Sequence, residues 1–163
     1  MHQQKVDLSV SLQLTRLGVV GHWGEILAGL EPWKTLGSTA TGLNRYLVQE
    51  DGALFRFVIG RQGQEVGILA IRYPWLRGPF IELLAIAPAF QQQGIASQVV
   101  EGIRLLTIPH CDNLWVTVSH FNQPARHFYQ RQGFTEIALL PGLIRPGQED
   151  WLLRRHPLQT KTS

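Results

Sequence analysis

The run Gln91-Gln92-Gln93-Gly94-Ile95-Ala96 directly follows an apolar segment and directly precedes a segment with helical spacing. The first turn of a helix has backbone N–H groups without intrahelical partners, and the helix dipole adds partial positive charge there. A phosphate can bind at such a junction, and the small residues Gly94 and Ala96 leave its backbone accessible. The run has neither the lysine of a P-loop nor the glycines of a dinucleotide fingerprint. It therefore predicts a pyrophosphate held by main-chain amides without a metal, or else an ordinary helix N-terminus.

Two other side chains are candidates for proton transfer. Tyr129 has a phenol, whose ordinary pKa near 10 suits a proton donor; the alternative is a core tyrosine beside Phe128. Glu82 is a carboxylate in an otherwise apolar segment. Burial of a carboxylate is costly, so it has either a charged or hydrogen-bonding partner or a functional role. We expect Glu82 to be a base, an anchor for a cationic amine, or the structural partner of Arg56 or Arg72.

Hydrophobic periodicity predicts the elements that position these residues. In the first third of the chain it predicts a strand over Leu8–Leu17, a short helix over Trp23–Leu30 and a helix capped by Ser38 or Thr39 that ends near Val48. A meander of three strands follows, over Ala53–Ile59, Glu65–Arg72 and Phe80–Ala87.

The rest of the chain predicts a helix from Ile95 to Leu106, a strand over Leu114–Val118, a helix over Ala125–Gln132 and a hairpin of Phe134–Leu140 with Asp150–Arg154. The order is β-α-α-β-β-β-α-β-α-β-β. A meander is antiparallel, and a strand–helix–strand unit adds a parallel neighbour. We therefore expect the α/β class, with a central mixed sheet flanked by helices on both faces.

Length and composition indicate one folded domain over residues 1–163, with a core over about 8–155 and a polar tail over 156–163. The chain is 44% hydrophobic and 17% charged, unlike a disordered protein. Its polar start and the absence of a stretch of roughly 20 apolar residues argue against export or a membrane and favour the cytoplasm. The net charge of +3 comes from scattered residues, which argues against nucleic acid. The six histidines and Cys111 show no metal-ligand spacing.

The Gln91–Ala96 run does not stand alone. Leu84-Ala85-Ile86-Ala87-Pro88 precedes it, and Asn122-Gln123-Pro124-Ala125-Arg126-His127-Phe128-Tyr129-Gln130-Arg131-Gln132-Gly133-Phe134 follows the next strand. Together these segments closely resemble the GNAT N-acetyltransferases, with their aV-x-P, [Q/R]-x-x-G-x-[G/A] and N-x-x-A-x-x-x-Y-x-x-x-G-F patterns. The predicted order of elements resembles the family's topology as well. The resemblance implies acetyl-CoA as co-substrate and direct transfer of its acetyl group to a primary amine in a ternary complex.

The family also implies residue roles. It binds acyl-CoA in a V-shaped gap between the third meander strand and the following parallel strand. The implied cofactor-binding residues are Leu84, Ala85, Ile86, Gln91, Gln92, Gln93, Gly94, Ile95, Ala96, Ser97 and Asn122. Of these, the main chain of Leu84–Ile86 faces the pantetheine and thioester, the turn holds the pyrophosphate, and Asn122 bonds the pantetheine arm. The Ile86 N–H stabilises the oxyanion, and Tyr129 lies near the thioester sulfur as the acid.

The acceptor is less determined. Glu82 favours a small amine with a second positive charge, and the alternative is a protein or peptide N-terminus or lysine. Enzymes that acetylate the N-terminal alanine of a ribosomal protein have a glutamate base where this chain has Thr117, which argues against that activity. A second alternative is a non-catalytic acyl-CoA-binding module. An edge strand over Asp150–Arg154 is also compatible with a homodimer.

Overall fold

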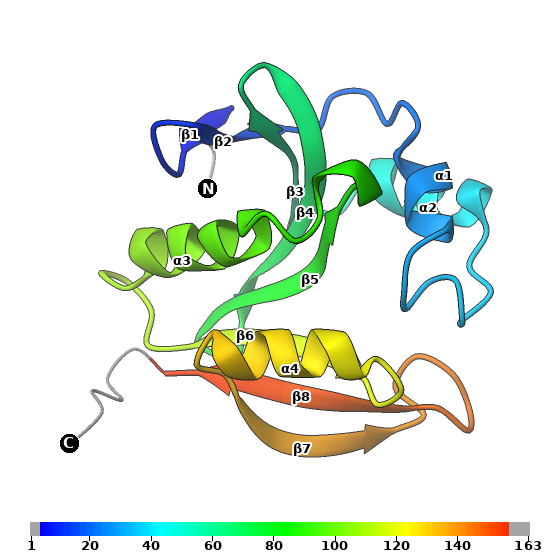
Figure 1. Ribbon diagram of the computed structural model, residues 1–163. Helices are drawn as coiled ribbons and strands as arrows, with labels where there is room; N and C mark the ends of the chain where they lie inside the picture. Colours follow the sequence, from blue (N-terminus) through cyan, green and yellow to red (C-terminus); the bar gives the residue numbers. More distant parts are fainter. Residues whose placement is uncertain (1–3, 157–163) are drawn as a thin grey trace.

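The computed structural model describes residues 4–156 and contains one mixed sheet with helices on both faces (Figure 1). The strands are β1 (Lys5–Asp7), β2 (Leu12–Arg16), β3 (Leu54–Arg61), β4 (Gln64–Trp75), β5 (Gly78–Ile86), β6 (Leu114–Ser119), β7 (Thr135–Pro141) and β8 (Glu149–Arg155). The helices are α1 (Trp23–Ala28), α2 (Ala40–Val48), α3 (Ile95–Thr107) and α4 (Gln123–Arg131), with a 3₁₀ turn over Pro88–Phe90. Within this part of the chain the strand order is β1-β2-β3-β4-β5-β6-β8-β7.

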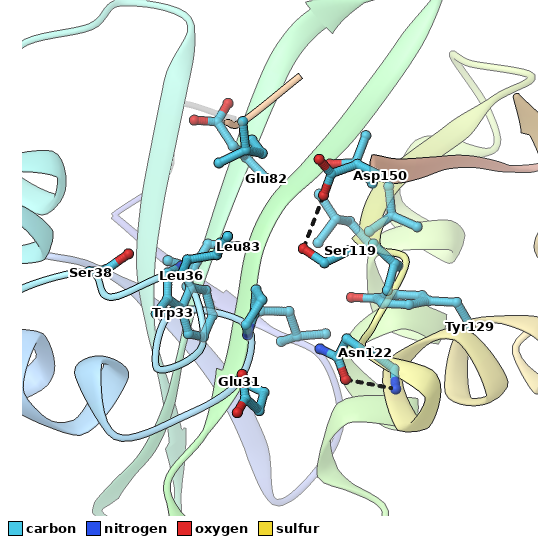
Figure 2. A pocket seen from close by; sticks show the side chains of 18 residues that line it. Glu31, Trp33, Leu36, Ser38, Glu82, Leu83, Ser119, Asn122, Tyr129 and Asp150 are labelled. Atoms are coloured by element: carbon cyan, nitrogen blue, oxygen red, sulfur yellow. Dashed lines mark hydrogen bonds between the residues drawn. The ribbon is translucent and has the colours of Figure 1, made fainter. Parts of the chain in front are cut away.

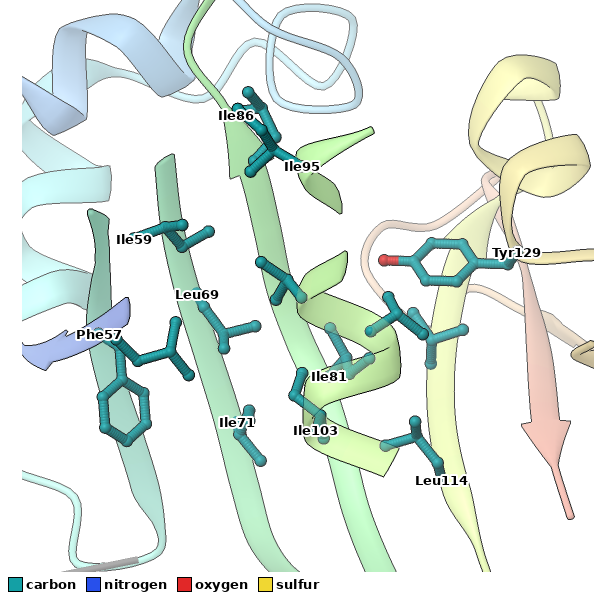
Figure 3. Close-up of a cluster of buried hydrophobic side chains, with 14 of the residues drawn as sticks. Phe57, Ile59, Leu69, Ile71, Ile81, Ile86, Ile95, Ile103, Leu114 and Tyr129 are labelled. Carbon is teal, nitrogen blue, oxygen red and sulfur yellow. The ribbon is translucent and has the colours of Figure 1, made fainter. Parts of the chain in front are cut away.

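Two apolar clusters hold the helices to the sheet. The larger cluster packs α3 and α4 on one face, with fully buried residues such as Ile59, Leu69 and Val99 (Figure 3). The smaller one packs α1 and α2 on the other face, through Trp23 and Leu27 of α1 and Leu43 and Leu47 of α2. Because β3, β4 and β5 lie between both clusters, they are apolar on both faces and could be recognised from the sequence as central strands.

The contact between β5 and β6 is the feature of the sheet that matters most for a site. These strands are parallel, and they are paired only at Phe80 with Trp115 and at Ile81 with Val116. Beyond Ile81 the strands have no register pairs, and Tyr129 of α4 lies in the opening between them (Figure 3). The sheet therefore splits where the family resemblance implied a V-shaped gap.

The predicted fold class is confirmed, with one strand more than predicted. The expectation of a continuous strand over Leu8–Leu17 was wrong in its first half. The N–H groups of Leu8 and Ser9 both donate to the Leu12 carbonyl and close a turn, and Val10 is fully exposed. The alternation of apolar residues there continues through a hairpin turn, which is followed by β2 and preceded by the unpredicted β1.

The C-terminal hairpin is present, but the expectation that Asp150–Arg154 forms an edge strand was wrong. β8 is hydrogen-bonded to β6 on one side and β7 on the other, so β7 lies at this edge of the sheet. β8 takes the inner position because Leu153 is fully buried in the larger cluster. In β7, by contrast, partly buried residues alternate with exposed ones, and none is fully buried. The predicted tail lies, apart from His156, outside the described residues. No helix within residues 4–156 is long and apolar enough to cross a membrane.

Candidate active site

Three cavities meet around the opening between β5 and β6. The inner cavity, of about 240 Å³, lies between β5, β6, α4 and the 31–38 loop (Figure 2). The turn cavity, of about 430 Å³, lies against the Gln91–Ser97 turn, and the loop cavity, of about 600 Å³, lies beside residues 29–35. Leu84 lines all three, and Tyr129 lies between the inner and turn cavities. Apart from Gln93, the site residues predicted from the sequence thus line these adjoining cavities.

The main chain of β5 faces this region at alternate residues. The Ala87 N–H bonds to the Val66 carbonyl of β4, and the register pairs Gly67 with Ile86. In an antiparallel ladder the next pair is not hydrogen-bonded, so the polar groups of Ile86 point away from β4, and those of Leu84 do the same. The Gln91 side chain donates to the Ile86 carbonyl over 2.9 Å on that side. The main chain of Ala85, by contrast, is turned toward β4.

The turn before α3 has the backbone form that an anion site requires. Gln92 and Gly94 have φ values of 59° and 77°, and Gly94 is the N-cap of α3 without a side-chain cap. The first N–H to bond back to the Gly94 carbonyl is that of Gln98. The amides from Ile95 to Ser97 are therefore free of helical partners at the turn cavity.

Two residues near this turn depart from the sequence expectation. Gln93 lines none of the three cavities, and its side chain donates to the Ala89 carbonyl over 3.3 Å. Arg131, from the last turn of α4, lines the turn cavity and places a positive charge there. Arg131 was not among the site residues predicted from the sequence.

Tyr129 comes from α4, which Asn122 caps by accepting from the Ala125 N–H over 3.4 Å. The tyrosine ring packs edge-on against Phe128 and Phe134, with ring centroids 4.9 and 5.3 Å away. Its hydroxyl points into the opening (Figure 2) and has no hydrogen-bond partner within residues 4–156. Burial raises the pKa of Tyr129 above its usual value, because the phenolate would be poorly solvated. The phenol is therefore protonated at neutral pH.

Glu82 is the extra residue of a β-bulge, since Ala70 pairs with Leu83 and Ile71 with Ile81. Arg72 donates to both of its oxygens, over 2.6 and 3.3 Å. The hydroxyl of Tyr46, from α2, donates to the Oε1 atom over 3.0 Å. These contacts are those of the structural alternative, with Arg72 rather than Arg56 as the partner, although Glu82 also lines the inner cavity. A catalytic part for Glu82 stays a prediction.

The inner cavity also contains a carboxylate that the sequence analysis missed. Asp150 of β8 is 3% exposed, and its Oδ1 atom accepts from the Ser119 hydroxyl of β6 over 3.0 Å. Its Oδ2 atom is buried and has no hydrogen-bond partner among the described residues. Both residues line the inner cavity (Figure 2). Asp150 follows a loop far from the recognised motifs, so only the β6–β8 register brings it to the site.

The family model described as "Acetyltransferase (GNAT) domain" matches residues 46–136, more than half of the chain. The chain belongs to the GNAT acetyltransferase family. By class, this GNAT domain is therefore an N-acetyltransferase with acetyl-CoA as acyl donor. The matched residues include β5, the Gln91–Ser97 turn and Tyr129, but they end before β7 and β8. No curated protein sequence matches the chain significantly.

Solved structures share the fold of this GNAT domain at low sequence identity. An acetyl transferase from Salmonella typhimurium, which modifies the N-terminal serine of ribosomal protein L7/L12, has 15% identity and a TM-score of 0.71 over 93% of this chain and 98% of its own. A GNAT family acetyltransferase from Elizabethkingia anophelis with acetyl-CoA bound has 17% identity and a TM-score of 0.67, over 91% and 99%. A chimeric spermidine N-acetyltransferase, SpeG, from Vibrio cholerae and hSSAT has 20% identity and a TM-score of 0.69, over 90% and 95%.

The charges of the GNAT domain are divided between its cavities. The inner cavity is lined by three carboxylates, Glu31, Glu82 and Asp150, and by no lysine, arginine or histidine. Arg131 lines the turn cavity and Lys34 the loop cavity. Trp33 lines both the inner and loop cavities and also packs against the smaller apolar cluster. Within residues 4–156, no group of three His, Cys, Asp or Glu side chains is placed to hold a metal.

Proposed function

We propose that this GNAT domain transfers the acetyl group of acetyl-CoA to a primary amine of a small, cationic metabolite, by direct attack in a ternary complex. The observation that carries the proposal is the meeting of three cavities at Leu84, two of which also share Tyr129. One of them contains the open N-terminus of α3, and another is lined only by neutral and acidic residues. A phosphorylated thioester suits the first, and an ammonium group suits the second.

In this proposal the pyrophosphate binds the amides of Ile95–Ser97 and the Arg131 guanidinium. The pantetheine arm runs along the open main chain of Leu84 and Ile86, beside Asn122. This path places the thioester near the Tyr129 hydroxyl, where the β5 main chain turns toward the opening. The Ile86 N–H stabilises the negative charge that develops on the carbonyl oxygen.

The chemical step forms one bond and breaks another. The neutral amine attacks the thioester carbonyl, a C–N bond forms, and the C–S bond breaks with its electron pair on sulfur. Tyr129 donates its proton to that sulfur and recovers one from the solvent. Because burial keeps the phenol protonated, Tyr129 is available as a donor throughout the neutral pH range.

The charge of the inner cavity supports a small amine with more than one positive group. A carboxylate attracts an ammonium group strongly where water is partly excluded. Of the three carboxylates that line this cavity, Arg72 pairs with Glu82, and the other two, Glu31 and Asp150, favour a di- or polyamine over a neutral acceptor. A protein N-terminus is the second candidate, because the Salmonella structure with this fold belongs to an enzyme that modifies one. Kinetics with spermidine, 1,4-diaminobutane and a serine-initiated peptide would separate the two.

Calorimetric titration with acetyl-CoA tests the cofactor site. We expect micromolar binding by the parent and loss of binding in Gly94→Glu, because the new carboxylate repels the pyrophosphate at the N-terminus of α3. Gly63→Glu is a matched control: Gly63 also has a φ of +77° and open space at the Cβ position, but it lies in the β3–β4 turn. The two variants have the same backbone strain. Absence of parental binding at hundreds of micromolar acetyl-CoA, or equal loss in both variants, would contradict the proposal.

A further inference from the structure

Asp150 has an unsatisfied carboxylate oxygen at the wall of the inner cavity. The side chain is almost fully buried, and the Ser119 hydroxyl occupies only its Oδ1 atom. Burial of a charged oxygen without a partner is expensive, so a carboxylate of this kind requires a cation or a proton from elsewhere. None of the described residues that line this cavity is a lysine, arginine or histidine. The lining residues therefore supply no cation for this oxygen, and a cationic ligand in the cavity would do so.

The position of Asp150 relative to the other polar groups also points to a ligand. Figure 2 shows the Asp150 carboxylate, the Ser119 hydroxyl and the Tyr129 hydroxyl along one wall of the inner cavity. They come from β8, β6 and α4, on the far side of the opening from β5. Glu82 comes from β5, and its carboxylate is engaged by Arg72 and Tyr46. Of the two carboxylates that β5 and β8 contribute to the lining of this cavity, Asp150 is thus the one with an oxygen that has no hydrogen-bond partner among the described residues.

We propose that Asp150 binds the ammonium group of the acceptor through its Oδ2 atom and takes a proton from it, and that Ser119 is the positioning residue that orients the carboxylate. This inference rests on the proposed acetyltransferase function and names the residue that prepares the nucleophile. The family match ends at residue 136, so it assigns nothing to Asp150.

The protons balance as follows. The bound ammonium transfers its first proton to Asp150 and becomes a neutral amine with a lone pair. The amine nitrogen attacks the thioester carbon, and the C–S bond breaks as Tyr129 gives a proton to sulfur. The nitrogen then loses its second proton to solvent, and Tyr129 and Asp150 return to their starting states by proton exchange with solvent. The net reaction converts the ammonium and acetyl-CoA to the acetamide, free CoA and one proton.

The test compares Asp150→Asn with the parent, with spermidine and 1,4-diaminobutane as probe amines. Asparagine retains the shape of the side chain and an oxygen to accept from Ser119, but it cannot take a proton. At pH 7 we expect kcat/KM to fall by about 100-fold or more, with the Kd for acetyl-CoA unchanged within twofold. Because only the neutral amine then reacts, the residual kcat/KM should rise about tenfold per pH unit toward the amine pKa, and the deficit should shrink.

Further variants separate this role from a structural one. Glu149→Gln removes an exposed carboxylate next in the chain and should keep the parental kcat/KM. Ser119→Ala should lower kcat with little change in the Kd for acetyl-CoA, and Ser119→Thr, which keeps the hydroxyl, should restore most of it. The Ser119 pair also tests the proposal if Asp150→Asn fails to fold.

Three results would overturn the assignment of Asp150. The first is a kcat/KM of Asp150→Asn within threefold of the parental value at pH 7. The second is a loss of kcat/KM in this variant that stays constant from pH 7 to 10. The third is a parent that binds acetyl-CoA but acetylates neither probe amine, which leaves the cofactor site standing. A parent that does not bind acetyl-CoA contradicts the proposed function itself, and the role of Asp150 with it.

Discussion

Arg72 and Glu82 lie on neighbouring strands, and the Arg72 Nε atom donates to the Oε2 atom of Glu82 over 2.6 Å. Arg72 also donates to Asp51 over 2.9 Å, and Tyr46 donates to Glu82. The network joins α2, β4 and the bulge of β5 on the face opposite α3. It explains how a carboxylate persists in an apolar strand: its charge is paired, and its oxygens accept hydrogen bonds.

Replacement of this carboxylate should mainly affect stability and amine affinity. Glu82→Gln can still accept from Tyr46 but loses its charge opposite Arg72, so we expect the free energy of unfolding to fall by about 1–2 kcal/mol. We also expect KM for spermidine to rise while kcat changes less than fivefold, because the inner cavity loses one of its negative charges. Denaturant titration and steady-state kinetics measure both, with the exposed Glu50→Gln as control. A 100-fold loss of kcat at constant KM would instead make Glu82 the base.

Tyr129→Phe separates an enzyme from a binding module. The ring remains packed against Phe128 and Phe134, so we expect the Kd for acetyl-CoA to stay within threefold of the parental value. Loss of the proton donor should lower kcat by about 100-fold. Tyr73→Phe, at a partly exposed tyrosine of β4, is the control and should retain the parental kcat. An unchanged kcat in Tyr129→Phe would remove the phenol from the mechanism.

Alkaline pH should destabilise the protein through its buried phenols. Burial raises the pKa of Tyr129, and burial, with the Glu82 charge nearby, raises that of Tyr46. The folded state therefore retains protons that the unfolded state loses above pH about 10, and stability falls as pH rises through that range. Each phenol contributes a slope of about 1.4 kcal/mol per pH unit. In urea titrations between pH 9 and 11, the free energy of unfolding should decline less steeply with pH for Tyr129→Phe than for the parent. The same slope in both proteins would argue against the raised pKa of Tyr129.

The close packing of α1 on α2 can be tested with two glycine substitutions. A Cβ at Gly24 would overlap the Asn44 side-chain oxygen and lie 2.6 Å from the Ala40 carbonyl oxygen. We expect Gly24→Ala to lower the free energy of unfolding by about 2 kcal/mol, because the helices must separate. At Gly29 the nearest contact is 3.5 Å, so Gly29→Ala should change stability by about 0.5 kcal/mol or less. Equal melting temperatures for the two variants would contradict this packing.

Periodicity and short motifs predicted what depends on local sequence. The helix start at Gly94, the Thr39 cap and the central position of β5 are each specified by neighbouring residues, and the structure contains all three. The turn over residues 8–11 was missed because its apolar alternation also fits a strand. Asp150 was missed for another reason: its proximity to Ser119 depends on strand register, which periodicity does not specify. The partner of Glu82 was among the alternatives, but the bulge that directs it toward Arg72 is a property of the paired strands.

The short seam between β5 and β6 has a mechanical consequence. The strands join at Phe80 and Trp115, and the Trp75 ring stacks on Phe80 at 4.7 Å and meets Trp115 edge-on at 5.5 Å. This aromatic cluster sits at the vertex of a wedge, and a small change in angle at a vertex becomes a larger displacement at the open end. The bulk of three rings that line none of the three cavities thus helps to set how far Tyr129 stands from Leu84.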